Sequence, residues 1–298
     1  MSMTQVPALV RTPLLEAACE ISGDPRGGPV PLPHGWPCDV RADDRVVPPL
    51  VAAGARVIVP GPRGFGATRF LASGTPRSGP PAALAADALD LLDALPAGKA
   101  LLAGYDWGGR AACILAARHP ERVRGLVTVN GCNIQDVAAS AAPENGQRYG
   151  YQWYFHGGRG RAGLARYRDD FCGLVRRHFS PTRAFDDACF RRTAASFDKP
   201  DCIDVTIHSH RVRCGLAAGD PRCADRERRL AARPSTGVPA ISMDGADDGV
   251  MPVGGTAAHA PHFTGPYEYR RLQGIGHALP REAPEAFAAA VPALHRRG

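Results

Sequence analysis

The chain has 298 residues, of which 44% are hydrophobic, and this length allows one large domain with an insertion or two domains. Its net charge of +7 comes from 36 basic residues, all of them Arg except Lys99 and Lys199. The arginines are scattered through an Ala-, Gly- and Pro-rich chain rather than gathered in one stripe with aromatic residues, so no nucleic-acid partner is indicated.

Short apolar runs alternate with amphipathic helical stretches in the first half of the chain, a pattern typical of a largely parallel sheet covered by helices. Each run ends in a loop of small or polar residues. Between the second and third runs, leucine and alanine recur at helical spacing over residues 84–95, which predicts a covering helix. The predicted strands are residues 29–32, 55–59, 100–104 and 126–130.

The alternation of strand and helix patterns stops between residues 133 and 229, where the sequence becomes rich in arginine and aromatic residues and has no apolar strand runs. We interpret this stretch as an inserted helical cap. Strand patterns return at residues 238–243 and 267–272, and a last helix is expected over residues 284–295. The predicted core domain therefore consists of residues 1–132 and 230–298, and the cap of residues 133–229.

The sequence Gly-Tyr-Asp-Trp-Gly-Gly at residues 104–109 follows a predicted strand and precedes a helical run. This is the strand-turn-helix context of a nucleophile elbow, in which glycines allow a tight turn that lifts the nucleophile above the edge of the sheet. Asp106 occupies the position of the nucleophile. The alternative reading is that Asp106 only caps the following helix.

Over nearly its whole length the chain resembles the α/β-hydrolase superfamily, and Asp106 makes it similar to the branch of epoxide hydrolases and haloalkane or haloacid dehalogenases. Attack of a carboxylate on an ester carbonyl would give an anhydride, whereas attack on an alkyl carbon gives an ester that water can cleave. The resemblance therefore implies a hydrolase of this branch and disfavours esterase and protease activity. Neither a cofactor nor a metal is implied.

The remaining catalytic residues are expected after the last two strands. His277, in Gly-Ile-Gly-His-Ala-Leu-Pro, lies where the superfamily carries its histidine, and it would activate the hydrolytic water. Three aspartates, Asp244, Asp247 and Asp248, follow the strand at residues 238–243, and Asp248 aligns with the family's acid. Its role would be to orient the imidazole and stabilise the imidazolium, with Asp247 as the second choice.

The resemblance also implies where the substrate is held. Backbone N–H groups of Trp36, in His-Gly-Trp-Pro, and of Trp107 would stabilise the oxyanion formed during ester hydrolysis. Epoxide hydrolases use two cap tyrosines to assist the epoxide oxygen, and Tyr151 matches the first of them. His210 stands at the place of the second, where it could donate a hydrogen bond as a neutral ring or a proton as a charged one.

Other features leave alternatives open. Dehalogenases hold the departing halide with N–H donors, for which Trp107 and Trp153 are candidates. Arg110 occupies a position where fluoroacetate-type dehalogenases bind the substrate carboxylate, although a protein carboxylate such as that of Asp106 is the partner that we favour for it. We therefore predict an epoxide hydrolase acting on a small molecule, with a dehalogenase or a non-catalytic ligand receptor as alternatives. A homodimer is left open.

The nine cysteines include no Cys-x-x-Cys pair and form an odd number, so neither a zinc cage nor a disulfide framework is indicated. The first residues lack the pattern of a signal peptide, and no segment runs 18 apolar residues. From these features we expect a soluble cytoplasmic protein without a membrane partner.

Overall fold

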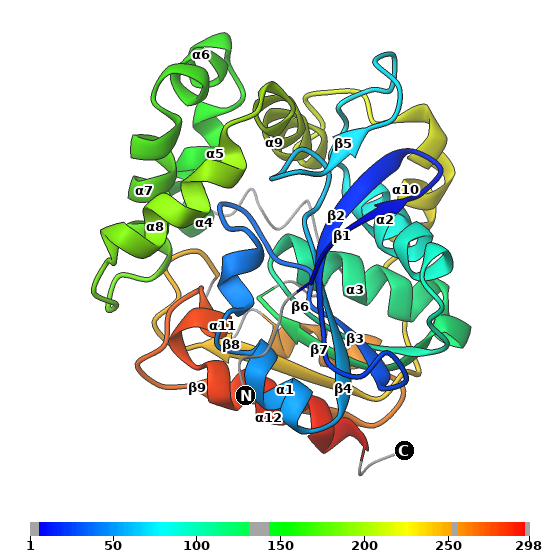
Figure 1. The fold of residues 1–298 in the computed structure, drawn as a ribbon. Helices are drawn as coiled ribbons and strands as arrows, with labels where there is room; N and C mark the ends of the chain where they lie inside the picture. Colours follow the sequence, from blue (N-terminus) through cyan, green and yellow to red (C-terminus); the bar gives the residue numbers. More distant parts are fainter. Residues whose placement is uncertain (1–5, 131–142, 252–255, 296–298) are drawn as a thin grey trace.

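The structure is a computed structural model that describes residues 6–130, 143–251 and 256–295. Its centre is a set of parallel strands, with four of them in the order β6-β7-β8-β9 and with β3 paired to β4 (Figure 1). The two groups meet where β3 lies beside β6. The parallel strands are β3 (Gly28–Pro31), β4 (Ala55–Pro60), β6 (Ala100–Tyr105), β7 (Val123–Val129), β8 (Ala240–Gly245) and β9 (Tyr267–Leu272).

The central parallel strands are buried on both faces, and this explains why they could be predicted from sequence. Every residue of β6 and of β8 is buried. A strand covered on both sides needs apolar or small residues at successive positions rather than at alternate ones, so it stands out as a continuous run. The predicted, mostly parallel sheet is confirmed.

Three antiparallel strands at the N-terminal edge were not predicted. In β2 (Leu15–Ser22) buried residues such as Leu15, Ala17 and Cys19 alternate with more exposed ones, because one face of this strand is not covered. It pairs with β1 (Val6–Arg11), β4 and β5 (Arg69–Phe70). A search for continuous apolar runs does not detect such an alternating strand.

Helices cover the two faces of the parallel strands, as predicted. On one face α2 (Pro81–Ala94) packs on α3 (Trp107–Arg118), which in turn contacts β6 and β7. On the other face α1 (Val47–Ala52) contacts β4, and α12 (Pro284–His295) contacts β7 and β8. The short helix α11 (Leu279–Glu282) precedes α12. The sheet therefore has its two layers of helices close to the positions expected from the sequence.

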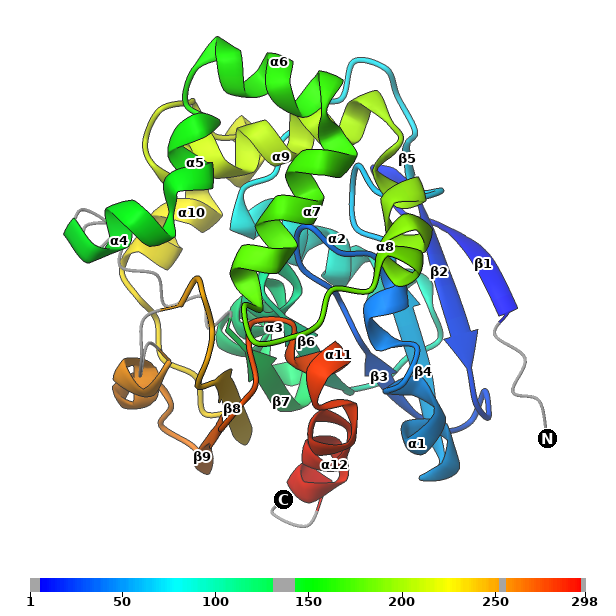
Figure 2. The same ribbon diagram turned by 90° about the vertical axis from the view of Figure 1, so that its left-hand side faces the viewer.

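Between β7 and β8 the chain forms a series of helices that we call the helical insertion. In Figures 1 and 2, most of these helices lie together at one end of the parallel strands, beyond the carboxyl end of β6. They are α4 (Pro143–Arg148), α5 (Gly150–Tyr154), α6 (Gly158–Arg166), α7 (Arg168–Phe179), α8 (Asp187–Ala194), α9 (Pro200–Arg213) and α10 (Ala224–Ala231). The predicted start of the cap, at residue 133, lies outside the described residues.

Short segments of 3₁₀ helix connect several of these elements. They are η1 (Val40–Asp43), η2 (Pro120–Arg122), η4 (Ala195–Phe197), η5 (Pro221–Cys223) and η6 (Ala257–His262). Among the described helices, none has both the length and the apolar character needed to cross a membrane.

Candidate active site

Asp106 stands between the end of β6 and the start of α3, in a backbone conformation that side chains rarely adopt. Its φ is 49° and its ψ is −118°. The conformation is held by neighbouring backbone: the Asp106 N–H donates to the carbonyl of Val129 at 2.9 Å, and its own carbonyl accepts from the N–H of Arg110 at 2.9 Å. Strained residues that their surroundings hold in place are concentrated at functional sites. The turn therefore has the geometry of a nucleophile elbow.

Two glycines make room for this turn. A Cβ at Gly108 would lie 1.9 Å from the carbonyl oxygen of Pro33, because the start of α3 presses against the loop that follows β3. A Cβ at Gly35 would lie 2.4 Å from the Cβ of Asp106. The loop after β3 and the elbow can approach this closely only because both positions lack a side chain.

The Asp106 carboxylate is 6% exposed, and its two oxygens have different partners. Oδ2 accepts a hydrogen bond from the backbone N–H of Trp36 at 2.9 Å. Oδ1 accepts one from Nη2 of Arg110 at 3.3 Å. Burial, followed by the charge of Arg110, lowers the pKa of Arg213 to about 10, so a second guanidinium lies close to this pair. The carboxylate thus has a backbone donor at one oxygen and an arginine at the other.

His277 lies between two carboxylates, one close and one farther away. Its Nδ1 is 2.8 Å from Oδ2 of Asp248, and its Nε2 is 4.0 Å from Oδ1 of Asp106. Because a carboxylate only accepts, Nδ1 carries a proton and a neutral ring has its lone pair on Nε2. Nε2 is buried and has no hydrogen-bond partner among the described residues. A basic nitrogen is thus directed toward Asp106.

The environment of His277 changes its affinity for a proton. Burial opposes the charged ring, but the charge and hydrogen bond of Asp248, together with the charge of Asp106, outweigh burial and raise the pKa of His277 above its ordinary value. Asp248 is itself held in place, because its Oδ1 accepts from the backbone N–H groups of Val250 at 2.7 Å and Met251 at 2.9 Å. The histidine is therefore oriented by a carboxylate that cannot easily rotate away.

The other two aspartates of this loop do not bind the histidine ring. Asp244 accepts hydrogen bonds from Thr256 and from the hydroxyl of Tyr269. The backbone N–H of Asp247 donates to the carbonyl of Ile275 at 2.9 Å. Of the three candidates, Asp248 is the one that the structure brings to His277.

Tyr151 of α5 lies over the loop that holds Trp36. The two rings are stacked, with centroids 5.7 Å apart and an angle of 20° between their planes. The Tyr151 hydroxyl accepts a hydrogen bond from Nε2 of Gln152 at 2.9 Å, which leaves its own proton to be donated. Burial, followed by the charge of Asp106, raises the pKa of Tyr151, so the phenol stays protonated. The structure thus brings an uncharged donor near the elbow.

His210 of α9 is buried among aromatic rings, with its centroid 5.2 Å from Trp36, 5.1 Å from Phe155 and 5.7 Å from Tyr151. Burial lowers its pKa to about 3, so it is neutral. Its Nδ1 is 2.8 Å from the carbonyl oxygen of Thr206, which only accepts, so the single proton of the neutral ring sits on Nδ1. Nε2 is then an acceptor. This geometry argues against both proton-donating roles considered for His210 in the sequence.

The two tryptophans considered as halide donors have different positions. Trp107 is 4% exposed and packs between Phe65 and His210, directly after Asp106. Trp153 is 40% exposed, and its indole N–H donates to the carbonyl of Gly146 at 3.1 Å. The structure therefore keeps Trp107 in the site and places Trp153 on the surface of the helical insertion, with its N–H already used.

Phe179, at the end of α7, belongs to this site and was not found by sequence reasoning. Its ring lies 4.7 Å from that of His277 and 5.3 Å from that of Tyr151. Its carbonyl accepts from the backbone N–H groups of both His277 and Gly249, each at 3.1 Å. Phe179 thus ties the histidine loop and the acid loop to the helical insertion. No motif marks it, because its contacts come from folding alone.

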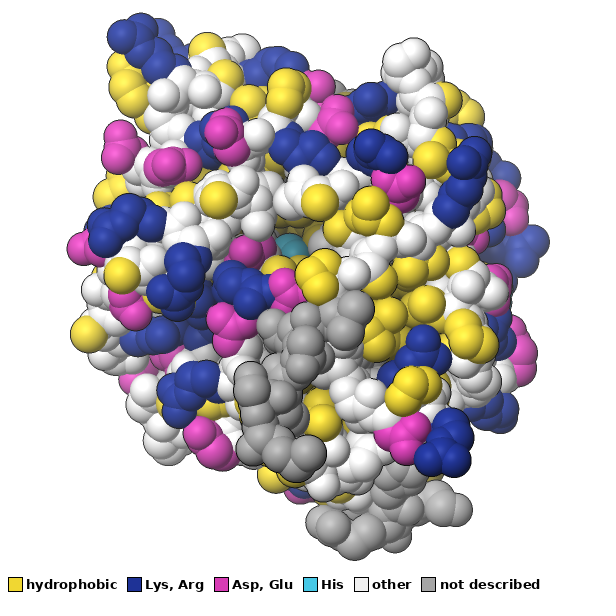
Figure 3. Space-filling model, in the orientation of Figure 1, with side chains coloured by type: hydrophobic (Ala, Val, Ile, Leu, Met, Phe, Trp, Pro, Cys, Tyr) yellow, Lys and Arg dark blue, Asp and Glu magenta, His cyan; other side chains and the backbone are white. Residues whose placement is uncertain are grey.

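The molecular surface is hollowed near the helical insertion, and a histidine side chain is visible at the bottom of the hollow (Figure 3).

The described residues include cysteines that are present as free thiols: Cys19, Cys38, Cys113, Cys172, Cys189, Cys202, Cys214 and Cys223. Within the described ranges, no group of three or more His, Cys, Asp or Glu side chains could hold a metal ion.

Residues 28–283 match the family model of the alpha/beta hydrolase fold. The chain belongs to this family. The elbow, the histidine loop and the acid loop described above all lie within the matched residues, so the predicted superfamily is confirmed.

Relatives within the family carry several names. A solved structure from Klebsiella pneumoniae subsp. pneumoniae, provisionally named an epoxide hydrolase, is 41% identical with a TM-score of 0.92, covering 99% of this chain and 97% of the other. Epoxide hydrolase B of Mycobacterium tuberculosis is 30% identical over 117 residues, 39% of this chain and 32% of that protein. A pimeloyl-[acyl-carrier protein] methyl ester esterase of Aromatoleum aromaticum is 30% identical over 230 residues, 74% of this chain and 80% of that protein. The matched segment thus spans about a third of the length of the Mycobacterium relative. These comparisons support a hydrolase.

Proposed function

We propose that the protein is an epoxide hydrolase that forms a covalent alkyl ester on Asp106. The observation that carries this proposal is the elbow itself, where a carboxylate has one oxygen held by Trp36 and the other directed toward the unpartnered Nε2 of His277. The name of the Klebsiella relative, at 41% identity over nearly the whole chain, supports the epoxide as substrate class.

In the first step, Oδ1 of Asp106 attacks a ring carbon of the epoxide while the carbon–oxygen bond of the ring breaks. The Tyr151 hydroxyl donates a hydrogen bond to the leaving oxygen and lowers the charge that develops on it. The proposal assigns no proton transfer to His210. Its neutral ring instead forms an aromatic wall of the pocket with Trp36 and Phe155.

In the second step, His277 takes a proton from a water molecule, which attacks Cγ of the Asp106 ester. The oxyanion forms on Oδ2, where the N–H of Trp36 already lies at hydrogen-bond distance. The N–H of Trp107 is the second donor that we propose. Asp248 stabilises the imidazolium, which gives its proton to Oδ1 as the bond between Cγ and Oδ1 breaks. The second proton of the water reaches the alkoxide formed on ring opening, the diol leaves with Oδ1, and the carboxylate is restored with an oxygen from water.

The likeness to an esterase over 74% of the chain does not imply esterase activity. A carboxylate that attacked an ester carbonyl would form an anhydride, and this route would give no catalytic advantage over direct hydrolysis of the substrate ester. The carboxylate at position 106 therefore favours attack at a saturated carbon. A dehalogenase reaction would use the same first step, and Arg110 near Oδ1 is the observation that favours it. The exposed Trp153 removes one of its two proposed halide donors.

Intact-protein mass spectrometry of a His277→Gln variant tests the proposal, because this variant forms the ester but cannot hydrolyse it. With styrene oxide, we expect a mass gain equal to the whole epoxide. A gain from a haloalkane or haloacetate, equal to the fragment without its halogen, would instead show a dehalogenase. A His119→Gln variant, which alters a surface histidine paired with Glu121, should not accumulate any adduct. No adduct with any of these compounds would contradict the proposal.

A further inference from the structure

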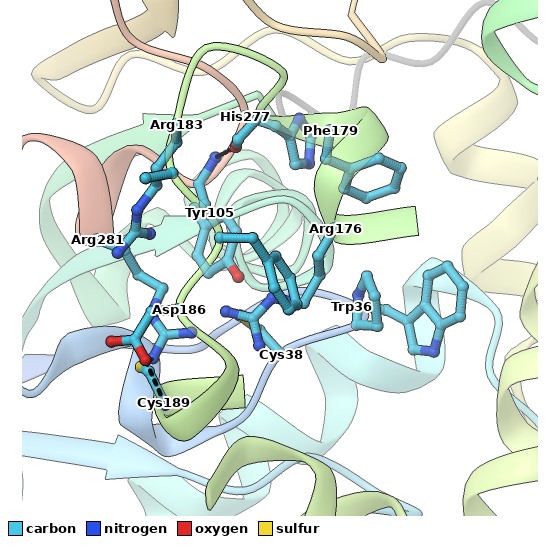
Figure 4. Close-up of a pocket in the computed structure, with 15 residues that line it drawn as sticks. Trp36, Cys38, Tyr105, Arg176, Phe179, Arg183, Asp186, Cys189, His277 and Arg281 are labelled. Carbon is cyan, nitrogen blue, oxygen red and sulfur yellow. Dashed lines mark hydrogen bonds between the residues drawn. The ribbon is translucent and has the colours of Figure 1, made fainter. Parts of the chain in front are cut away.

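A small pocket adjoins the candidate active site and shares Trp36, Phe179 and His277 with it. Trp36 and His277 line it together with Tyr105, the residue that precedes Asp106 (Figure 4). The cavity is small, about 40 Å³, and both the core and the helical insertion contribute to it. This volume suits about three water molecules or one small ligand group. The proposed reaction does not use it.

Three arginines contribute to the lining of this pocket. Arg176 belongs to α7, Arg183 follows that helix, and Arg281 comes from α11 of the core. Figure 4 shows their side chains around the cavity. Among the described residues, no carboxylate lies within ion-pair distance of any of the three guanidinium groups. Positive charge is therefore concentrated here without a direct ion pair in the part of the chain that the structure describes.

The guanidinium of Arg281 is only partly satisfied by its neighbours. Arg281 is 6% exposed, and its Nη1 is buried without a hydrogen-bond partner among the described residues. Its Nη2 donates to the sulfur of Cys189. Nη1 of Arg176 is likewise buried and without a described partner. Buried donors of charged groups normally have acceptors, because leaving them unpaired is costly.

The carboxylates nearest to this pocket are engaged elsewhere. Asp186 is its one acidic lining residue among those described, and it caps α8 by accepting from the N–H of Cys189 at 2.9 Å. Glu282 accepts from the hydroxyl of Ser180 at 2.6 Å and from the N–H of Gly276 at 2.8 Å. Asp39 accepts from the hydroxyl of Ser196 at 2.9 Å. Asp43 is buried and its charge interacts with that of Arg281, so the protein itself neutralises part of the positive charge at this pocket.

We propose that this pocket is a binding site for a small carboxylate. The planar fork of a guanidinium matches the two oxygens of a carboxylate, and three such groups converge on a cavity that would hold little more than that head group. The bound carboxylate would join Arg281 of the core to Arg176 and Arg183 of the helical insertion. Its source is either a free small acid or an acidic tail of the substrate.

Binding is measured by isothermal titration of the protein with acetate and with formate, which needs no turnover. We expect saturable binding that weakens about tenfold in Arg183→Gln and in Arg281→Gln, because each variant removes a charge-assisted pair. Arg191→Gln, on the exposed side of α8, is the control and should bind as the wild type does. If Arg281→Gln does not fold, the half-buried Arg183 decides the question.

The proposal is overturned if neither acid binds saturably, if both pocket variants bind as the control does, or if chloride binds as tightly as acetate. Kinetics with an epoxide that carries a carboxylate tail then separate the two sources. Acetate that raises KM without changing kcat occupies the place of a substrate tail, and acetate that leaves KM unchanged is an independent ligand. This last arm depends on the proposed function, whereas the titration does not, so the two can fail separately.

Discussion

At the scale of single residues, the site depends on which charged group lies next to each ring nitrogen of His277. Nδ1 of His277 faces Asp248 and Nε2 faces Asp106, so the ring has one orienting partner and one basic nitrogen that accepts no hydrogen bond from the described residues. The charges that orient the ring also hold its proton more tightly. Only the neutral ring can accept a proton from water. The carboxylates must therefore orient the ring without keeping it protonated at the working pH.

The pH dependence of hydrolysis measures this balance. In the proposed reaction a protonated His277 cannot accept a proton from water, and its raised pKa means that activity should increase with pH through an acid limb above about 6.5. Asp248→Asn should move this limb to lower pH and reduce kcat by about 10³ to 10⁴, because the imidazolium loses its partner. Asp247→Asn is the control. An acid limb at the same pH in wild type and Asp248→Asn would contradict the assignment.

Sequence motifs were sufficient to propose the residues that now lie together, but not to describe their surroundings. Asp106, Asp248 and His277 each follow a strand within a recognisable loop, so their positions depend on local patterns. His210 shows what such patterns leave out. Its tautomer and low pKa depend on the carbonyl of Thr206 and on burial among rings from distant segments, and neither can be read from spacing.

At the scale of elements, the elbow depends on close contact between β6, α3 and the loop after β3. Gly108 lies at this contact, because a Cβ on it would point at the carbonyl oxygen of Pro33. The sequence placed this turn well because glycine-rich turns after apolar strands are distinctive. It missed β1 and β2, whose alternating residues carry no comparable signal. Covered strands and tight turns were therefore predictable, and the partly exposed edge was not.

A Gly108→Ala substitution tests the importance of this contact. The new Cβ would lie 1.9 Å from a backbone oxygen, so the loop after β3 must move. We expect the free energy of unfolding to fall by about 1–3 kcal/mol or more in urea titrations. Gly98→Ala, where a Cβ meets nothing within 4 Å, should change it by less than about 0.5 kcal/mol. Equal stabilities of the two variants would show that the contact is not tight.

At the scale of the whole molecule, a buried network connects the core to the helical insertion. Arg63 is 1% exposed and donates to both oxygens of Asp87 at 2.6 Å and to the carbonyl of Ser78 at 2.9 Å. The hydroxyl of Ser78 in turn donates to Asp220 of the insertion at 2.8 Å. Arg63 therefore holds the loop around Ser78 in place, and Ser78 contacts the helical insertion through Asp220. None of these partners is adjacent to Arg63 in sequence.

Replacing Arg63 by Met should destabilise the protein by about 3–5 kcal/mol, because Asp87 would keep its charge in a largely buried place without a partner. Thermal and urea unfolding measure the effect. Arg26→Met removes an ion pair with Asp24 in which the arginine side chain is 91% exposed, and it should leave stability unchanged. A similar effect in both variants would mean that the buried network does not stabilise the molecule.

The central claim is that Asp106, and not water, attacks the substrate. A single turnover in ¹⁸O-labelled water tests it, with wild-type enzyme in excess over styrene oxide and the product analysed by mass spectrometry. If Asp106 is the nucleophile, the first diol takes its new oxygen from the carboxylate and carries no label, while a peptide containing Asp106 gains ¹⁸O. Label in the first diol and none in that peptide would show direct attack by water and contradict the mechanism.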